Sequence, residues 1–189
     1  MLKISSPNWG TYACEDDCVY EGEWKNGKPE GKGKYRWPNG DIYIGQFKAG
    51  QRYGIGAYIY DNHQLFFGQW EHDKMIEGLF KWPNGTKYFG KFKDGLRHGN
   101  GTINHVNCQS YDGQWERDKI HGKGKMTYAN GDEYVGQFKD DKRHGNGKMT
   151  YANGNEYVGE FIDDNIHGKG IFIIDNNVYY CEMKKKNVF

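Results

Sequence analysis

Apolar and polar residues alternate with a period of two along most of the chain, in segments separated by short polar interruptions. Residues 111–133 show the pattern clearly: the first segment reads Y-x-G-x-W and the second reads G-x-G-x-M-x-Y. Residues i and i+2 lie on the same face of a β-strand. Each pair of segments therefore predicts a β-hairpin with one face made of aromatic residues and glycines.

The hairpin pattern recurs as an internal repeat. Residues 134–156 are identical to residues 111–133 at 16 of 23 positions. Repeats begin at residues 20, 43, 66, 88, 111, 134 and 157, in steps of 23 residues except for a third step of 22, and an eighth begins at Tyr180 but degenerates at once. A fixed period is typical of proteins that stack one supersecondary unit. We expect an irregular N-terminal cap at residues 1–19, seven repeats over residues 20–179 and a degenerate C-terminal cap at residues 180–189.

Parity also predicts the two kinds of connection between strands. Trp115 and Gly122 share a face only if the turn between them holds an even number of residues, which would place the tryptophan ring over a strand without side chains. Tyr128 and Tyr134 share a face only if the connection between their strands contains an odd number of residues. This favours a three-residue loop with Gly131 in the left-handed region.

Three repeats depart from this pattern. The loop glycine is replaced by His63 in the second repeat and by Cys108 in the fourth. The third repeat is one residue short, and Ile76 stands where the other repeats have the first glycine of the second strand. We expect a distorted turn in the third repeat.

The repeat resembles the MORN repeat (membrane occupation and recognition nexus), whose unit reads roughly Y-x-G-x-W/F-x-x-G-x-x-H-G-x-G, followed by an aromatic residue and an N-G turn. Tyrosine, glycine, an aromatic residue and two further glycines recur at the same offsets in repeat after repeat. The resemblance implies an all-β fold, an elongated single-layer antiparallel β-meander of about seven stacked hairpins. With ~4.8 Å between strands, such a stack would extend over roughly 65 to 70 Å.

Composition and charge narrow the classes of function. Aromatic residues make up 16% of the 189 residues and 28 residues are glycine, while 26 basic and 25 acidic residues leave a net charge of +1. The two signs are interspersed, so no basic stripe for nucleic acid is evident, and the Lys184–Lys186 run is interpreted as a solvated tail or cap. The chain has no apolar stretch of membrane-spanning length and no leader, so we expect a soluble, cytoplasmic protein.

Histidines, cysteines and glycines offer candidate chemistry, and a structural explanation is favoured for each. Equivalent positions in neighbouring hairpins lie ~10 Å apart, too far to share one metal ion, which argues against metal binding by the four histidines that precede glycines: His98, His121, His144 and His167. Cys14 and Cys18 bracket three acidic residues, but reduced surface thiols are favoured over a metal site because no second ligand pair accompanies them. The glycine-rich segments lack phosphate-binding and nucleophile motifs. We expect no catalytic residue, metal or cofactor.

Specificity must lie where the repeats differ, because the recurring positions build the sheet. Opposite the aromatic face, the fifth and sixth repeats are polar, whereas the second to fourth repeats are apolar. The predicted partner-binding residues are Ile44, Ile55, Ala57, Ile59, Phe67, Leu79 and Phe89, with the irregular Met75 and Ile76 beside them. A contiguous apolar patch on a solvated face is a candidate docking surface for a partner helix or a second copy of the chain. The alternative is that residues 1–19 fold back and cover the patch.

The resemblance to MORN proteins implies a non-enzymatic scaffold for protein–protein interaction. The stand-alone array is similar to ciliary radial-spoke-head proteins and to protist MORN proteins, which implies a structural subunit of a cytoskeletal or ciliary (axonemal) assembly such as a radial spoke. Other proteins of that assembly are the expected partners, and a homodimer is an alternative. Two further alternatives are a tether on membrane phospholipids, which the near-neutral charge disfavours, and a regulatory subunit of an enzyme.

Overall fold

The computed structural model describes residues 9–13 and 17–183, whose regular structure consists of β-strands. The chain forms two compact units, divided between Gly95 and Leu96. The first unit contains β1 (Trp9–Ala13), β2 (Val19–Lys25), β3 (Lys28–Arg36), β4 (Ile42–Lys48), β5 (Gln51–Ile59), β6 (Leu65–Glu71), β7 (Lys74–Lys81) and β8 (Lys87–Lys93). The second contains β9 (Leu96–Asn104), β10 (Ser110–Glu116), β11 (Lys119–Thr127), β12 (Glu133–Lys139), β13 (Lys142–Thr150), β14 (Glu156–Ile162), β15 (Asn165–Ile174) and β16 (Asn177–Met183).

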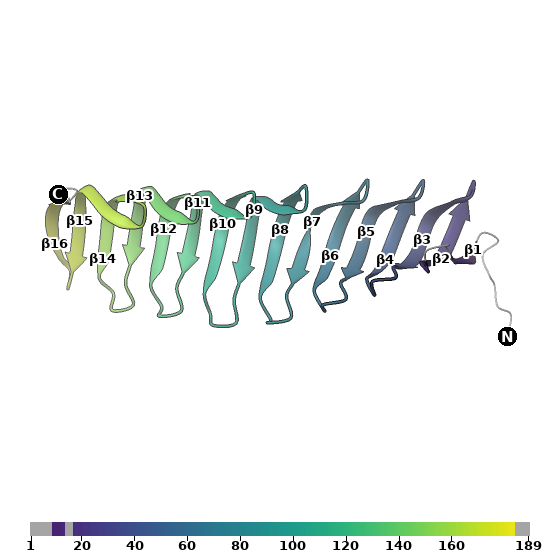
Figure 1. The fold of residues 1–189 in the computed structure, drawn as a ribbon. Coiled ribbons are helices and arrows are strands. Elements are labelled where there is room, and N and C mark those ends of the chain that lie inside the picture. The colour runs from purple at the N-terminus through teal and green to yellow at the C-terminus, as the bar shows by residue number, and fades with distance from the viewer. Residues whose placement is uncertain (1–8, 14–16, 184–189) are drawn as a thin grey trace, which may run out of the picture. The chain divides into compact units, whose positions relative to one another are not determined.

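In each unit, every strand pairs antiparallel with the next one in the chain, from β1 to β8 in the first unit and from β9 to β16 in the second (Figure 1). Each unit is therefore a single-layer β-meander. This confirms the all-β, antiparallel fold class that the repeat predicted.

Tight two-residue turns close one end of the hairpins. Arg117 and Asp118, which join β10 to β11, both have positive φ angles, 49° and 68°. Two consecutive positive φ values define a type I′ turn, whose twist matches that of the flanking strands. The even turn predicted from the parity of Trp115 and Gly122 is confirmed.

The other end of the hairpins carries longer loops. In the loop between β11 and β12, the Tyr128 amide donates to the Asp132 carbonyl (2.8 Å) and the Gly131 amide donates to the Tyr128 carbonyl (3.0 Å). Gly131 has a φ of +90°. The three-residue loop with a left-handed glycine is therefore confirmed.

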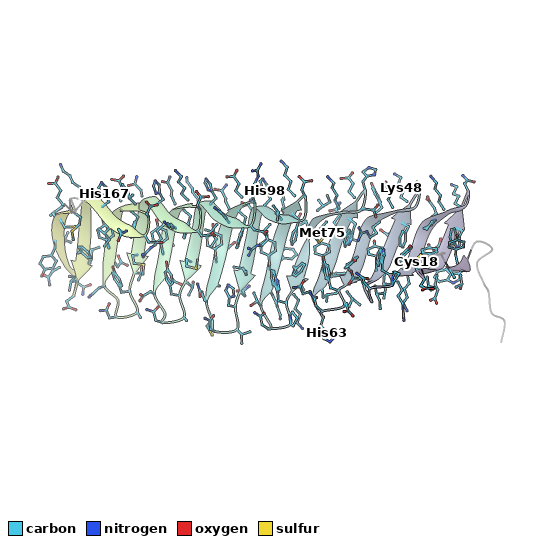
Figure 2. The ribbon with its side chains drawn as sticks, in the orientation of Figure 1. Cys18, Lys48, His63, Met75, His98 and His167 are labelled. Atoms are coloured by element: carbon cyan, nitrogen blue, oxygen red, sulfur yellow. The ribbon has the colours of Figure 1, made fainter. Side chains whose placement is uncertain are left out.

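Two residues other than glycine occupy this left-handed loop position. His63 and Cys108 have φ angles of 67° and 66°, close to the region that the loop glycines use. Figure 2 shows His63 in a loop at the end of the strands opposite to Lys48. A Cβ atom in this conformation clashes with the backbone, so both residues are held there by the closure of the loop.

The short third repeat has a regular turn, so the expected distortion of its turn is wrong. His72 and Asp73 have φ angles of 47° and 65°, the type I′ values. The missing residue comes instead from a bulge in the second strand. In β5 two residues are left between register pairs, whereas in β7 Ile76 alone lies between the pairs Gln69↔Glu77 and Trp70↔Met75. The bulge residues Gly54 and Ile55 of β5 pair with β6, so the shorter bulge leaves β7 with five register pairs to β8 where β5 has six to β6.

The aromatic face is built from tyrosine rings that lie over pairs of glycines. Tyr134 is fully buried, and a Cβ added at Gly136 or Gly147 would overlap its ring. The Tyr134 hydroxyl donates to the carbonyl oxygen of Gln137 at 3.0 Å. Burial of the phenol raises the pKa of Tyr134 to about 12. The ring thus uses space that side chains would otherwise fill, and its hydroxyl group is still hydrogen-bonded.

The tryptophan was expected to cover the glycines, and this interpretation is wrong. It is Tyr111 that covers Gly113 and Gly124, whereas the Trp115 indole nitrogen donates to the carbonyl oxygen of Gly101 on β9 at 2.8 Å. A Cβ added at Gly122, the first glycine of the second strand, would meet the Gln114 side chain first, and Gly122 has a φ of +67° in the bulge. Parity placed these residues on the right face but could not show which ring lies over which strand.

Edge-to-face contacts join neighbouring tyrosines through the aromatic residue between them. The Tyr134 ring lies 5.0 Å from Phe138 and 5.0 Å from Phe161, with interplanar angles of 87° and 80°. In the first unit, Tyr43 makes the same contacts with Phe47 and Trp70. Such contacts add roughly 0.5–1.5 kcal/mol per pair to the burial of the rings.

An arginine clasp in every second repeat links that repeat to the next one over the aromatic face. Arg143 Nε lies 3.2 Å from Asp164 Oδ1, and Nη2 donates to the Asp164 carbonyl oxygen at 2.8 Å. The guanidinium group lies 5.2 Å from the centroid of the Phe161 ring. The same clasp is formed by Arg52 with Asp73 and by Arg97 with Asp118. Each clasp joins two neighbouring tight turns.

In the last strand, the residues that face the aromatic side are shifted by one position relative to the other repeats. Two residues with positive φ, Asp175 and Asn176, replace the three-residue loop, so β16 is shifted by one residue. Tyr179 pairs with Phe172 on the aromatic face, whereas Tyr180 pairs with Ile171 and is 84% exposed. The start of an eighth repeat at Tyr180 is therefore wrong. The expected cap at Lys184–Lys186 lies outside the described residues.

The glycine under each tyrosine predicts a specific stability difference. Gly147→Ala should lower the free energy of unfolding by about 3 kcal/mol, because its Cβ displaces the Tyr134 ring. Gly154→Ala should cost only about 1 kcal/mol, since Gly154 has a φ of +87° but an added Cβ meets no atom within 4 Å. Urea denaturation followed by circular dichroism measures both. Equal losses would contradict the ring-over-glycine packing.

The loop residues with strained backbones predict a stabilising substitution. Cys108→Gly should raise the free energy of unfolding by about 1 kcal/mol, because glycine accepts the positive φ without a Cβ clash. The reverse change at the equivalent position, Gly131→Cys, should lower it by a similar amount. Denaturation under reducing conditions tests both variants. A destabilised Cys108→Gly variant would show that a contact of the thiol stabilises the protein by more than the backbone strain at Cys108 costs.

Candidate docking surface

The predicted apolar residues lie opposite the aromatic face of the first unit and form a continuous row. The strand register pairs Ile44 with Ala57, Ala57 with Phe67, Phe67 with Leu79, and Leu79 with Phe89. We call these five residues the outer stripe. Ile44, Phe67 and Phe89 are 49%, 52% and 59% exposed, whereas Ala57 and Leu79 are less exposed. The stripe crosses β4 to β8 at right angles to the strands.

A second apolar row lies beside the outer stripe. Ile59 pairs with Ile42 on one side and with Leu65 on the other. Sequence reasoning included Ile59 but missed Ile42 and Leu65, although all three share the parity of the stripe. Ile42 and Leu65 stand at the first positions of their strands, where only the observed register places them on the sheet rather than in the loops.

Met75 and Ile76 do not belong to this surface, in contrast to their predicted position. Met75 pairs with Trp70, a residue of the aromatic face, and occupies the position that Arg52 and Arg143 have in their repeats. Ile76 is the extra residue of the β7 bulge, and both side chains are only partly exposed. They were predicted to form an irregular turn beside the patch, but the turn lies at His72 and Asp73, so both residues stand within β7.

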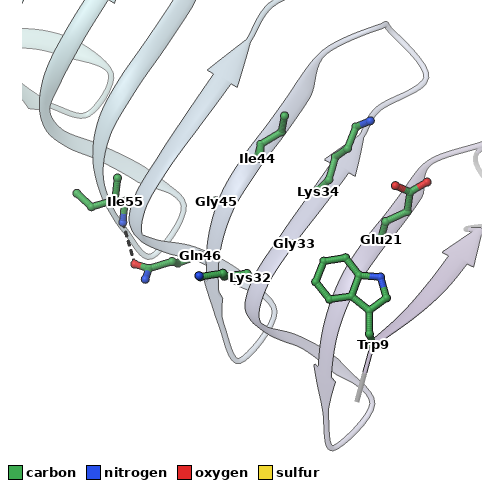
Figure 3. Close-up of a pocket in the computed structure, with 9 residues that line it drawn as sticks. All are labelled: Trp9, Glu21, Lys32, Gly33, Lys34, Ile44, Gly45, Gln46 and Ile55. Carbon is green, nitrogen blue, oxygen red and sulfur yellow. Dashed lines mark hydrogen bonds between the residues drawn. The ribbon is translucent and has the colours of Figure 1, made fainter. Parts of the chain in front are cut away.

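A cavity of about 490 Å³ lies beside the outer stripe (Figure 3). Its apolar lining comes from Ile44, Ile55 and Trp9, and its polar lining comes from Glu21, Gln46 and the lysines of β3. The Gln46 side-chain oxygen accepts a hydrogen bond from the Ile55 amide at 3.0 Å, which fixes the β5 bulge at the cavity wall. Trp9 is 53% exposed. Sequence reasoning did not select it, because its repeat is degenerate.

The N-terminal segment does not cover the stripe in the part of it that is described. Residues 9–13 form β1, which pairs edge to edge with β2: Trp9 lies opposite Glu23, and Ala13 opposite Val19. The strand therefore extends the sheet of the first unit and brings Trp9 to the rim of the cavity. Residues 1–8 and 14–16, which also belong to the segment of the covering alternative, lie outside the described residues.

Basic side chains flank the outer stripe. At one end, β3 carries Lys32, Lys34 and Arg36, of which Lys34 pairs with Ile44 and Arg36 with Ile42. At the other end, Lys81 pairs with Lys87 and Lys91 pairs with Glu77. Within the described residues, the ion pairs include none of these basic residues. The first unit thus presents an apolar row between two groups of lysine and arginine.

The same face of the second unit mixes charged residues with valines over β10 to β14 and becomes apolar at Ile171 and Tyr180, on β15 and β16. The row equivalent to the outer stripe runs through Asp112, Lys125, Val135, Lys148 and Val158. Lys125 and Lys148 form ion pairs with Glu133 and Glu156, at 2.8 and 2.6 Å. This unit has the same backbone and a different surface, so it is an internal control for the outer stripe.

The histidines and cysteines of the described residues are not gathered into a metal site. Among the described residues, no group of three or more histidine, cysteine, aspartate or glutamate side chains is placed to hold a metal ion. His98 and His121 line a common cavity of about 210 Å³, and His121 Nε2 lies 3.8 Å from Glu116. Cys18 is buried and disulfide-bonded, which contradicts the expected reduced surface thiol, and Cys14 lies outside the described residues.

The described part of the chain contains no helix with the length and apolarity needed to span a bilayer.

Comparison with protein families identifies the repeat. The family model described as MORN repeat matches residues 20–42, 43–64, 66–87, 88–103, 111–133, 134–156 and 157–178. The seven-repeat array is thus confirmed. None of the curated proteins matches the chain.

Solved structures share the fold at low sequence identity. The chain is similar to the TCP domain of SAS-4 (dCPAP) of Drosophila melanogaster, solved in complex with a proline-rich motif of Ana2 (dSTIL), with 12% identity over 97% of this chain and 95% of that chain and a TM-score of 0.52. It is also similar to the G-box domain of the microcephaly protein CPAP, with 10% identity over 93% of this chain and 99% of that chain and a TM-score of 0.49. The similarity concerns the fold alone.

The two faces of β6 predict opposite responses to mutation. Phe66 is fully buried, so Phe66→Ala should lower the free energy of unfolding by about 3–5 kcal/mol. Its neighbour Phe67 is 52% exposed, so Phe67→Ala should cost less than about 1 kcal/mol. Guanidinium denaturation of the two variants is the measurement. A large loss for Phe67→Ala would show that the outer stripe is part of the core rather than a free surface.

Proposed function

This chain belongs to the MORN repeat family, a non-enzymatic repeat module for interaction with proteins or membranes, and from that premise we propose that it is a protein-interaction scaffold whose docking surface is the outer face of the first unit. The observation that carries the proposal is the outer stripe. Ile44, Phe67 and Phe89 are about half exposed in one continuous row, although the fold needs no apolar residues there. Contiguous exposed apolar surface of this kind marks interaction sites.

The second unit shows that the fold does not require the stripe. Its equivalent row contains Asp112, Lys125 and Lys148, yet β10 to β14 pair in the same register pattern as β4 to β8. The tyrosine–glycine packing stabilises each unit from the opposite face. The apolar residues of the first unit therefore support a role in binding rather than in folding.

A protein partner is favoured over a lipid surface by the shape of the site. Trp9, Ile44 and Ile55 line a hollow of about 490 Å³, which a peptide segment can fill and a flat bilayer surface cannot. The Drosophila TCP domain, which shares the fold, was solved with a proline-rich motif. That complex supports the idea that a single-layer sheet of this type can serve as a platform for a peptide.

We extend the proposal to the setting that the repeat implies. The scaffold is a structural subunit of a cytoplasmic, cytoskeletal or ciliary assembly such as a radial spoke, and its partners are other proteins of that assembly. This step rests on the resemblance of the stand-alone array to spoke-head and protist MORN proteins. Imaging of the tagged protein in its native cells tests it, and a uniform cytosolic distribution without cytoskeletal enrichment argues against it.

Charge introduced into the docking surface should abolish partner binding without unfolding the protein. The double variant Ile55→Lys/Ile59→Lys changes two exposed side chains, so we expect it to lose the partners that affinity purification and mass spectrometry recover with the unmodified protein. Its β circular dichroism should be unchanged. The charge would be desolvated in the interface without a counterion, which is strongly unfavourable.

The matched control is Val135→Lys/Val158→Lys, which places the same charges on the equivalent face of the second unit. It should retain the partners. Flotation with anionic liposomes is the second arm of the test, because salt-sensitive vesicle binding lost in the Ile55→Lys/Ile59→Lys variant would favour the lipid alternative. Partners retained by that variant would refute the proposed surface.

A further inference from the structure

Exposed and less exposed side chains alternate along the outer stripe. The exposed residues Ile44, Phe67 and Phe89 lie on β4, β6 and β8, and Ala57 and Leu79, on β5 and β7, separate them. Neighbouring strands are ~4.8 Å apart, so an exposed ridge recurs every ~9.6 Å across the sheet. Each ridge is followed by a shallower position. The stripe is therefore a row of ridges and depressions rather than a uniform apolar band.

The ridge spacing fits one regular peptide conformation best. A polyproline II helix has three residues per turn and rises ~3.1 Å per residue, so its turn is ~9.3 Å long. Two turns of an α-helix measure ~10.8 Å. The polyproline II turn thus matches the ~9.6 Å ridge spacing more closely than the α-helix does. Proline-rich segments also favour grooves bounded by aromatic side chains, as Phe67 and Phe89 provide here.

The basic side chains that flank the stripe indicate the charge at the ends of a peptide bound to it. Lys34 and Arg36 lie beside Ile44 and Ile42 at one end, and Lys87 and Lys91 lie on β8 at the other. In the second unit, by contrast, Lys125 and Lys148 already have glutamate partners. Lys34 and Lys91 lie opposite Glu21 and Glu77, but the ion pairs of the described residues include neither lysine, so both can still attract carboxylates, most strongly where the contact is partly desolvated.

We propose that the outer stripe binds a proline-rich segment of a partner protein in the polyproline II conformation, which lies across β4 to β8 with acidic residues at both of its ends. The inference rests on the proposed function and names its partner class. From β4 to β8 the stripe covers about 19 Å, which corresponds to roughly six residues of polyproline II between the acidic ends. Apolar side chains and prolines pack between the ridges, and the carboxylates face the lysines.

The test uses synthetic peptides and the full chain. A fluorescein-labelled peptide with two Pro-Pro-Leu triplets between Glu-Glu ends should give saturable binding by fluorescence anisotropy. Phe67→Ala and Phe89→Ala should each weaken this binding at least ~10-fold, the effect of a truncated interface anchor. Val135→Ala and Val158→Ala, on the equivalent row of the second unit, should leave it unchanged. Phe67→Leu replaces Phe67→Ala if the circular dichroism of the latter departs from that of the unmodified protein.

Three comparison peptides decide between occupants. Glycine in place of proline should weaken binding ~10-fold, because the unbound chain is then no longer pre-organised. Lysine in place of the terminal glutamates should weaken binding at low salt. If the lysine-ended peptide binds as tightly as the glutamate-ended one, the proposal that the bound segment has acidic ends is wrong. Preferential binding of a helical glutamate–leucine peptide overturns the polyproline II conformation.

The outcomes for this inference and for the proposed function are separable. If the proline peptide fails to bind while partner capture still depends on Ile55 and Ile59, the inference is overturned and the scaffold function stands. If partner capture is unaffected by charge on this face, the docking surface itself is wrong. Binding of the proline peptide that depends on Phe67 and Phe89, and not on Val135 and Val158, supports both.

Discussion

Each repeat depends on one contact, the packing of a tyrosine ring onto two glycines of adjacent strands. Most domains bury apolar surface between two layers, and a single-layer sheet has no second layer to supply a core. The ring over the glycine pair takes that place. Seven rings are at most 1% exposed, although among the described residues they are covered by side chains of their own sheet and not by a second layer: Tyr20, Tyr43, Phe66, Tyr88, Tyr111, Tyr134 and Tyr157. The glycines are therefore core positions without side chains.

This packing separates stability from recognition. The aromatic face, its edge-to-face contacts and the arginine clasps all lie on one side of the sheet, so the opposite side is free to vary from repeat to repeat. The second unit uses that freedom for paired charges such as Lys125 with Glu133. The first unit uses it for the outer stripe, and the neighbouring Lys34 and Lys91 lie opposite glutamates without joining the ion pairs of the described residues. The difference between two units with one architecture is stronger support for a docking surface than exposure alone.

Parity along the chain was enough to predict the hairpins, the even turns, the left-handed loop glycine and the face on which Ile44, Phe67 and Phe89 lie. Each of these depends only on whether two residues are separated by an odd or an even number. The features that were missed depend on the register between strands. Parity could not show that tyrosine rather than tryptophan covers the glycines, that the missing residue of the third repeat comes from the bulge at Ile76, or that β16 is shifted to bring Tyr179 into line.

In the predicted site too, the residues that were misplaced or missed are those whose position depends on the register between strands. Met75 was predicted to lie in an irregular turn beside the stripe, and the register places it on the aromatic face opposite Trp70. Trp9 was missed because only its pairing with β2 brings it to the cavity. The ridge spacing of the outer stripe is likewise invisible in the sequence, since its members are separated by whole hairpins along the chain. A repeat protein thus encodes its scaffold in short-range periodicity, while its recognition surface emerges across the strands, where small departures from the repeat are brought into one row.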